Sequence, residues 1–300
     1  MGLIIWAGSV FIIKFFALHF LIVLKKKKIS VIIPAFRRSR VDNVETLRRS
    51  LLGGSLPPDE IIVVEGVSPA AAARNLGVER SKGDILVFID DDARLSTPDV
   101  LERVVETLLS DDSIGIAGAS QDIPPSASGF QKEYRHEFER ARSQVVEEIT
   151  ESDMATTLFC AIRREDFTAA GGFDESLPAG EDNYLRHRIR GLGKKVVLAP
   201  GALVYHPLPG SWGELYRRAR WYGSARAILA KREDAPFAGI RLQSKTAALG
   251  YLIVQWALFP FRLFIGGPTG RKFGFWPLRA VAHLVNSTAY AAAVIRGDGR

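Results

Sequence analysis

Three consecutive carboxylates follow a short apolar segment in the first half of the chain. The segment is Ile85–Ile89, and Asp90, Asp91 and Asp92 come directly after it. A β-branched apolar run of this length predicts a buried strand. Three adjacent negative charges repel one another unless a cation lies among them, and carboxylate oxygens suit Mg²⁺ or Mn²⁺ shared with a substrate diphosphate. An acidic turn before the next helix is the alternative that this string alone leaves open.

A second acidic pair, Glu181 and Asp182, follows a turn at residues 177–180. The residues after the pair have helical spacing, so the two carboxylates stand in the first turn of a predicted helix. Capping and the helix dipole are the ordinary explanation of acidic residues there. A carboxylate acts as a general base only if it comes within about 3 Å of the hydroxyl proton that it removes. The elements around the pair must decide between these roles.

Strand-like and helix-like segments alternate around the three carboxylates. The strand-like segments are short apolar runs, and the helix-like segments repeat apolar residues at helical spacing. In chain order they are Ile29–Ala35, Val41–Leu52, 61–64, 69–80, Ile85–Ile89, 97–109 and 114–119. This order predicts an α/β fold with a mostly parallel sheet flanked by helices. Ligands of such sheets lie at the carboxyl ends of the strands, which is where Asp90 and Asp92 stand.

The composition excludes several classes of protein. The chain has 300 residues, 47% hydrophobic and 24% charged, which excludes a largely disordered chain. Cys160 is the only cysteine, which excludes a disulfide scaffold. The net charge of +7 suits anionic partners, and its position beside apolar segments favours a membrane over nucleic acid. Residues 130–151, rich in Glu and Arg at mixed spacing, predict a solvated helix without chemistry.

Residues 1–28 predict a membrane anchor. The only strongly polar members of residues 2–24 are Lys14 and His19, and this stretch is long enough to span a bilayer core of about 30 Å. Four lysines follow at 25–28, the reverse of the charge order in a cleaved signal peptide. By the positive-inside rule we expect a cell-membrane protein whose catalytic domain lies on the cytoplasmic side. Lys14 leaves an interfacial helix as the alternative to a transmembrane one.

Two further apolar stretches occupy the C-terminal segment, which we place at residues 241–300. They lie at 246–261 and 280–295, and both are short for a membrane span. A spanning hairpin would put the basic residues between them outside, against the charge rule. We therefore expect membrane-associated helices that lie in the interface or re-enter it. A pair of ordinary buried helices is the alternative.

Seven segments, taken together, resemble a known family. They are ISVIIPA (29–35), EIIVVE (60–65), AARNLG (72–77), GDILVFIDDD (83–92), RREDFTAAGGFDE (163–175), ED (181–182) and YH (205–206). In this order they resemble family 2 glycosyltransferases with the GT-A fold, over roughly residues 29–230. The resemblance implies a Rossmann-like nucleotide-binding half followed by an acceptor half, in a domain that we place at residues 29–240.

The resemblance also implies a donor site and a metal site. The donor-binding residues that it implies are Pro34, Ala35, Glu65, Arg74, Asp90 and Asp91. A guanidinium such as that of Arg74 suits bidentate contact with phosphate, and a surface helix charge is the alternative. Asp90 and Asp92 match the family's DxD motif, and His206 matches a histidine that completes the metal site in some members. The implied cofactor is Mn²⁺ or Mg²⁺.

On the acceptor side, the resemblance implies a base and a binding surface. It assigns Asp182 as the general base, with Glu181 orienting it, and so an inverting transfer. The acceptor-binding residues that it implies are Gly172, Asp174, Arg220 and Trp221. Only Arg220-Trp221 agrees with the Gln-x-x-Arg-Trp motif of processive relatives, which argues against the synthesis of long chains.

These observations together predict an inverting glycosyltransferase. We expect it to move a sugar from a nucleoside diphosphate sugar to a lipid-linked or glycan acceptor at the cytosolic membrane face. A sugar nucleotidyltransferase is one alternative, although residues 36–40 have the basic charge of its phosphate loop without the glycines. An inactive membrane-bound binding module is another, and it would not need Asp92 and Asp182.

Overall fold

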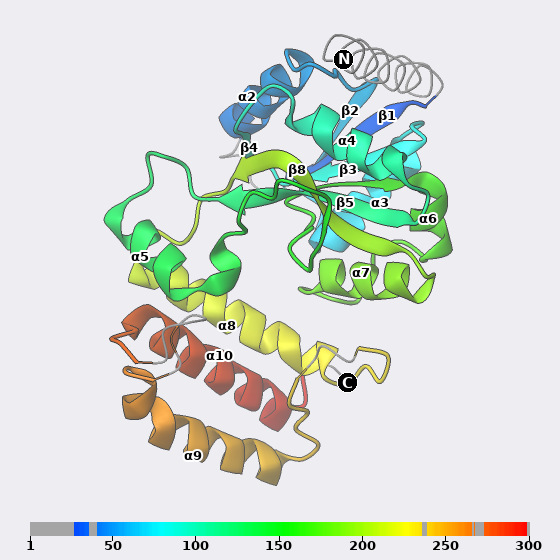
Figure 1. The fold of residues 1–300 in the computed structure, drawn as a ribbon. Coiled ribbons are helices and arrows are strands. Elements are labelled where there is room, and N and C mark those ends of the chain that lie inside the picture. The colour runs from blue at the N-terminus through cyan, green and yellow to red at the C-terminus, as the bar shows by residue number, and fades with distance from the viewer. Residues whose placement is uncertain (1–26, 36–40, 236–238, 266, 268–272, 299–300) are drawn as a thin grey trace, which may run out of the picture.

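The computed structural model describes residues 27–35, 41–235, 239–265, 267 and 273–298. Most of the predicted anchor at residues 1–28 lies outside these ranges. Within them, the chain forms a central sheet with helices on both faces and a separate layer of C-terminal helices (Figure 1).

The sheet of the described residues has eight strands. Along the sheet their order is β2-β1-β3-β7-β5-β8-β4, and β6 pairs with β8. The bounds are β1 Ile29–Ala35, β2 Glu60–Glu65, β3 Ile85–Ile89, β4 Arg94–Leu95, β5 Ile114–Asp122, β6 Thr150–Glu151, β7 Phe159–Arg163 and β8 Lys195–Tyr205. The predicted α/β fold is confirmed, and the sheet is mixed: β1 lies parallel to β2 and β3, β5 lies parallel to β8, and β4, β6 and β7 are antiparallel to their neighbours.

The parallel part of the sheet brings three strand ends to one edge. Ala35 lies opposite Glu65, and Ile32 lies opposite Phe88, two residues before Asp90. The strand β1 lies between β2 and β3, so the connections from β1 to β2 and from β2 to β3 run in opposite directions along the sheet. Open α/β sheets bind ligands at such a point. The carboxyl ends of β1, β2 and β3 therefore meet as the sequence predicts.

The antiparallel strand β7 is the main departure from the expected topology. The strand predicted at 114–119 is β5, but β7 lies between it and β3. All five residues of Phe159–Arg163 are buried. A short apolar run that is buried on both faces does not indicate the direction of the strand, so the position of β7 in the sheet could not be predicted from the sequence.

Helices cover both faces of the sheet. Those that pack on the sheet are α2 Val41–Leu52, α3 Ala70–Arg80, α4 Val100–Ser110, α6 Arg164–Ala169 and α7 Glu181–Gly191, whereas α5 Gly129–Glu137 packs against the C-terminal helices. One core cluster joins the sheet to α2 and α4 through Leu47, Val104 and Leu108. The other joins it to α6 and α7 through Phe167 and Leu185. These buried faces fix the start of α7, with its acidic pair, relative to the strand ends.

Three long helices form the C-terminal layer: α8 Trp212–Leu229, α9 Lys245–Arg262 and α10 Pro277–Arg296. In Figure 1, α10 lies between α8 and α9, which is the outermost of the three. The helices α8 and α10 touch closely at Gly223, where an added Cβ would come within 2.2 Å of the carbonyl oxygen of Asn286. Among the described residues, no helix combines the length and the apolar character that crossing a bilayer requires.

The segment at 130–151 is not the solvated helix that its composition predicted. Its helix ends at Glu137, whose side chain is fully buried. The Glu137 carboxylate accepts hydrogen bonds from the backbone N–H groups of Leu278 and Arg279, at 3.2 and 2.7 Å, at the start of α10. A carboxylate at a helix N-terminus satisfies donors that the helix leaves unpaired. The burial of Glu137 is explained by a contact with Leu278, which is 141 residues away in the chain, and spacing in the sequence does not show such a contact.

Candidate active site

One buried guanidinium joins the end of β3 to the start of α7. Arg74, on α3, is 3% exposed. Its Nη2 donates to Asp90 Oδ1 at 2.8 Å and its Nη1 to Glu181 Oε1 at 2.7 Å. Burial opposes the charge of Arg74, but these two carboxylates outweigh it and raise the pKa of the guanidinium. The carboxyl end of β3 and the first turn of α7 are thus held together by one side chain.

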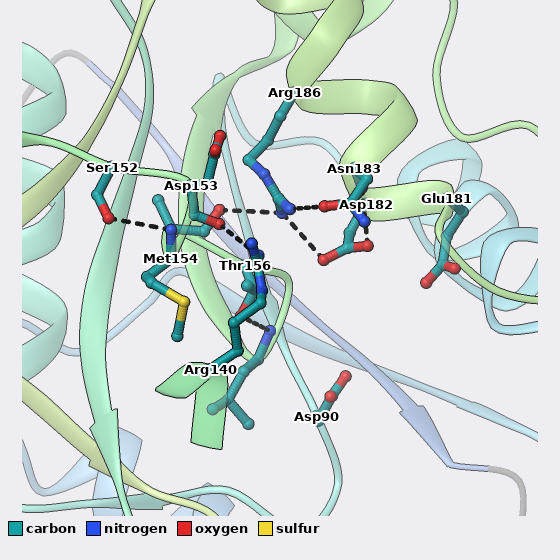
Figure 2. Close-up of polar contacts among 12 residues, drawn as sticks. Asp90, Arg140, Ser152, Asp153, Met154, Thr156, Glu181, Asp182, Asn183 and Arg186 are labelled. Carbon is teal, nitrogen blue, oxygen red and sulfur yellow. Dashed lines mark hydrogen bonds and ion pairs between the residues drawn. The ribbon is translucent and has the colours of Figure 1, made fainter. Parts of the chain in front are cut away.

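The two members of the acidic pair have different partners. Glu181 contacts Arg74, whereas Asp182 Oδ2 accepts a hydrogen bond from Arg186 Nη1 at 2.9 Å. In Figure 2 the Asp182 carboxylate is turned toward Arg186, and Glu181 lies apart from it. Burial raises the pKa of Glu181 above its ordinary value. Burial acts in the same direction on Asp182, but Arg186 outweighs it and lowers the pKa of that carboxyl.

The left-handed turn before α7 allows this arrangement. Gly180 has a φ of 85°, a conformation that side chains disfavour, and it is the N-cap of the helix. The helix begins with Glu181 because the chain turns sharply there. The side chains of Glu181 and Asp182 in this first turn then point toward different guanidinium groups, those of Arg74 and Arg186.

Asp92 and His206 lie side by side after β3 and β8. After β3 the chain turns into β4, which pairs with the end of β8, with Arg94 opposite Tyr205. This pairing brings Asp92 Oδ1 within 3.5 Å of His206 Nε2. No group of three His, Cys, Asp or Glu side chains is close enough to enclose a metal ion within the described ranges. Two of the three predicted metal ligands therefore meet, and Asp90 is occupied by Arg74.

The remaining predicted donor residues lie along the same edge. Pro34 and Ala35 end β1, and Glu65 ends β2 directly opposite Ala35. Gly66 follows with a φ of 70°, and its N–H donates to the Ala35 carbonyl at 3.0 Å. Asp91 is buried, at 6% exposure. The edge of the sheet thus presents the end of β1 and the Glu65 carboxylate beside the carboxylates after β3.

The predicted acceptor turn is tied to α3 and to the segment after α8. Asn75 Nδ2 donates to the Phe173 carbonyl at 2.9 Å, and Asn75 Oδ1 accepts from the Phe173 N–H at 3.0 Å. Gly172 has a φ of 69° and packs against Asn75, so a side chain would be strained there. The Asp174 carboxylate, predicted to bind the acceptor, forms an ion pair with Arg232 Nη2 at 2.7 Å.

A family model described as "Glycosyltransferase like family 2" matches residues 56–224. The chain belongs to this family. The match includes α3, β3, the acidic pair and the first part of α8, whereas β1, with Pro34 and Ala35, precedes it.

One relative and one solved structure agree with this membership. Glycosyltransferase AglE of Haloferax volcanii is 28% identical over 159 residues, which are 53% of this chain and 51% of AglE, so the chain spans about half the length of that relative. Mannosyltransferase PcManGT from Pyrobaculum calidifontis, solved in complex with GDP-Man and Mn²⁺, has a TM-score of 0.54 at 15% identity and covers 91% of this chain and 88% of its own. This second likeness shows a shared GT-A fold.

Two side chains of α8, Tyr222 and Arg218, lie within electrostatic reach of the candidate carboxylates. Tyr222 is 43% exposed, and its pKa is raised by the surrounding protein and then by the charges of Asp182 and Glu181. Arg218 lies over the Tyr222 ring at 5.7 Å, and its pKa is raised, against burial, by Tyr222, Tyr134 and Asp92. These two residues are four apart and share one face of the helix.

Arg220 and Trp221, the predicted acceptor residues, are both exposed on α8. An α-helix turns about 100° per residue, so Arg220 lies nearly opposite Arg218 and Tyr222. Leu215, which is buried, shares a face with Arg218 and Tyr222, and Tyr222 is itself 43% exposed. The acceptor role of Arg220 and Trp221 stays a prediction.

Proposed function

We propose that this family 2 member is an inverting glycosyltransferase. It moves a sugar from a nucleoside diphosphate sugar to a lipid-linked acceptor at the cytosolic face of the cell membrane. The observation that supports this most directly is the Arg74 bridge, because it holds Asp90, at the donor edge, beside the Glu181-Asp182 pair on the acceptor side. Donor and acceptor chemistry therefore meet at one point of the fold.

The donor binds along the edge formed by β1, β2 and β3. Pro34 and Ala35 lie beside the nucleotide, and Glu65 accepts a hydrogen bond from the base or ribose. Asp92 and His206, 3.5 Å apart, would hold a divalent metal, Mn²⁺ or Mg²⁺, since carboxylate oxygens suit both ions. When bound, the metal would offset the charge that develops on the departing diphosphate. The GDP-Man and Mn²⁺ in PcManGT support this reading.

Asp182 is the general base in this mechanism. It removes the proton of the acceptor hydroxyl as the oxygen attacks the anomeric carbon, and the bond to the diphosphate breaks on the opposite side. The proton ends on the Asp182 carboxyl, the electron pair leaves with the nucleoside diphosphate, and the anomeric configuration inverts. Glu181, the residue before Asp182, is held by Arg74, and the Asp182 oxygens are held by Arg186 and the Asn183 N–H.

The outermost helix supports a membrane partner. Residues 246–261 contain no charged side chain. Their outward face exposes large apolar side chains to between 41% and 62%, namely Leu249, Ile253, Val254, Trp256, Leu258 and Phe261. A continuous apolar face of this kind marks an interaction site, and basic Lys245 and Arg262 at its two ends suit anionic headgroups. We propose that α9 lies in the membrane interface and keeps the site near a lipid-linked acceptor.

Donor turnover by detergent-purified protein tests the proposed function. A panel of nucleoside diphosphate sugars is offered with Mn²⁺, Mg²⁺ or EDTA. We expect turnover of one donor that EDTA abolishes, and a loss of about a hundredfold or more in Asp92→Ala, because the charge on the leaving diphosphate is then poorly offset. The anomeric configuration of the product, read by NMR, tests inversion. If the wild type turns over the donor equally with metal and with EDTA, and Asp92→Ala is as active as the wild type, the metal site is wrong.

A further inference from the structure

Arg186 is a fully buried cation one helical turn beyond Asp182. It is 2% exposed and is among the largest fully buried side chains of the described residues. Its Nη1 pairs with Asp182 Oδ2 at 2.9 Å, and the Asp182 side chain is 22% exposed. Placing a guanidinium in the interior is costly, and a buried ion pair is weak evidence of a contribution to stability. The position of this one calls for another explanation.

The guanidinium is held in place from two elements. Its Nη2 donates to Asn183 Oδ1 on α7, and its Nη1 also donates to the Ala155 carbonyl at 3.5 Å. Figure 2 shows Arg186 between the loop that contains Asp153 and Met154 and the start of α7. The loop approaches this closely because Gly118 lies beneath it: a Cβ there would be 2.7 Å from Ala155 Cα. Arg186 is therefore directed at Asp182 by the packing of the core.

Both oxygens of Asp182 are oriented as a result. Oδ2 takes the Arg186 hydrogen bond, and Oδ1 accepts from the Asn183 backbone N–H at 2.7 Å. Burial alone would raise the pKa of Asp182, and Arg186 reverses the direction. Glu181 is paired with Arg74, which also acts to lower its pKa, but burial outweighs Arg74 there and the pKa is raised. Burial therefore prevails at Glu181 and the guanidinium prevails at Asp182.

We propose that Arg186 is a positioning residue of the transfer reaction, which keeps Asp182 ionised and aimed so that the acceptor is deprotonated down to acidic pH. This inference rests on the proposed function, because it gives Asp182 the role of base. It adds a residue that needs no contact with either substrate. Its contribution acts through the orientation and charge state of Asp182.

The other groups that act on Asp182 do not titrate in the same range, apart from one. Arg74, on α3, stays charged. Cys160 on β7 and Tyr222 on α8 stay neutral, since burial raises the pKa of both, that of Cys160 to about 12. The exception is Glu181, because its raised pKa brings its titration closer to neutral pH. It therefore requires its own control.

The test is the pH dependence of kcat/KM for sugar transfer in Arg186→Met. We expect the acid limb to move up by about one pH unit, because a cation close to a carboxyl lowers its pKa by about that much or more. The pH at which kcat/KM falls to half of its plateau should rise by that amount, so the loss relative to wild type should be greatest below pH 5, and the donor Kd should stay within twofold. Arg190→Met is the matched control: it removes the same charge from the same helix, where Arg190 pairs with Asp153 at 2.8 Å.

Two further variants make the result decisive. The shift caused by Arg186→Met must persist in a Glu181→Gln background, or the titrating group is Glu181. Asn183→Ala, which removes a partner of Arg186 without changing charge, should lower the transfer kcat severalfold with an unchanged donor KM, and it decides the matter if Arg186→Met does not fold. A uniform loss at all pH values, or no change of kcat in Asn183→Ala, would overturn the proposal. Absence of donor turnover by the wild-type chain would instead overturn the proposed function.

Discussion

Arg74 is the residue on which the assembly of the site depends most. Both of its terminal nitrogens contact carboxylates, and one of these belongs to each half of the fold. The sequence resemblance assigned it to phosphate, which a guanidinium also suits. The bridge adds a role that only the tertiary structure reveals: it neutralises Asp90 and Glu181 where they would otherwise repel each other.

Replacing this bridge should destabilise the protein. Arg74→Met leaves the Glu181 and Asp90 side chains, 12% and 32% exposed, without their cation. We expect a loss of about 2–3 kcal/mol in the free energy of unfolding, reduced from the value for a fully buried pair because Asp90 is partly solvated. Urea denaturation measures it. Arg49→Met, which removes an exposed cation paired with Glu45 on α2, should change stability by less than about 0.5 kcal/mol. Equal effects of the two substitutions would contradict the bridge.

At the scale of elements, Glu137 joins α5 to α10, the middle helix of the C-terminal layer. The helix α5 is also fixed to the sheet, because Arg135 Nη2 donates to Asp122 Oδ2 at 2.6 Å. The Asp122 carbonyl in turn accepts from the His206 N–H at 2.9 Å. The short helix α5 therefore contacts both the start of α10 and Asp122, the residue whose carbonyl holds the N–H of the candidate metal ligand His206.

The pH dependence of stability should reveal Glu137. Burial raises its pKa above the ordinary value, although the two N–H groups of α10 act in the opposite direction. A carboxyl with a raised folded-state pKa binds its proton more tightly when folded, so its contribution to stability is greatest below the unfolded pKa and falls as the pH rises through the folded one. Tm is measured from pH 4 to 8 for wild type and Glu137→Gln. The advantage of the wild type should shrink as the pH rises, and an advantage that grows with pH would show that α10 favours the charged form.

The elements with local signals were predictable from the sequence. The helix Val41–Leu52 and the strand Ile85–Ile89 were predicted with the bounds that the structure has, because hydrophobic periodicity and β-branched runs act over neighbouring residues. Direction and order in the sheet were not, as β7 shows. The segment at 130–151 was misread because Glu137 is stabilised by residues far away in the chain.

The site could be predicted in part for the same reason. Asp90, Glu181 and Asp182 were identified through motifs, and the structure joins Asp90 to Glu181 through Arg74. Tyr222 and Arg186 were missed. A buried arginine inside a helix looks like a surface charge in the sequence, and only the packing of Ala155 over Gly118 shows why it is enclosed.

For the whole molecule, the apolar face of α9 predicts docking on a membrane. We expect Ile253→Asp combined with Trp256→Asp to lower binding to vesicles that contain anionic lipid at least tenfold, because both side chains lie on the exposed face, at 62% and 56%. Co-sedimentation with vesicles measures it. Leu52→Asp, at a similarly exposed apolar position on α2, is the matched control and should bind as the wild type does. Undiminished binding of the double variant would exclude α9 as the docking surface.

The central claim is that this chain transfers a sugar with Asp182 as the base, and one comparison tests it most directly. Transfer to acceptor and binding of donor are measured side by side in wild type and Asp182→Asn, at saturating donor. Loss of a general base costs about a hundredfold or more in rate. We predict that loss in transfer, with a donor Kd within twofold of the wild-type value. Transfer by Asp182→Asn within tenfold of wild type would contradict the account.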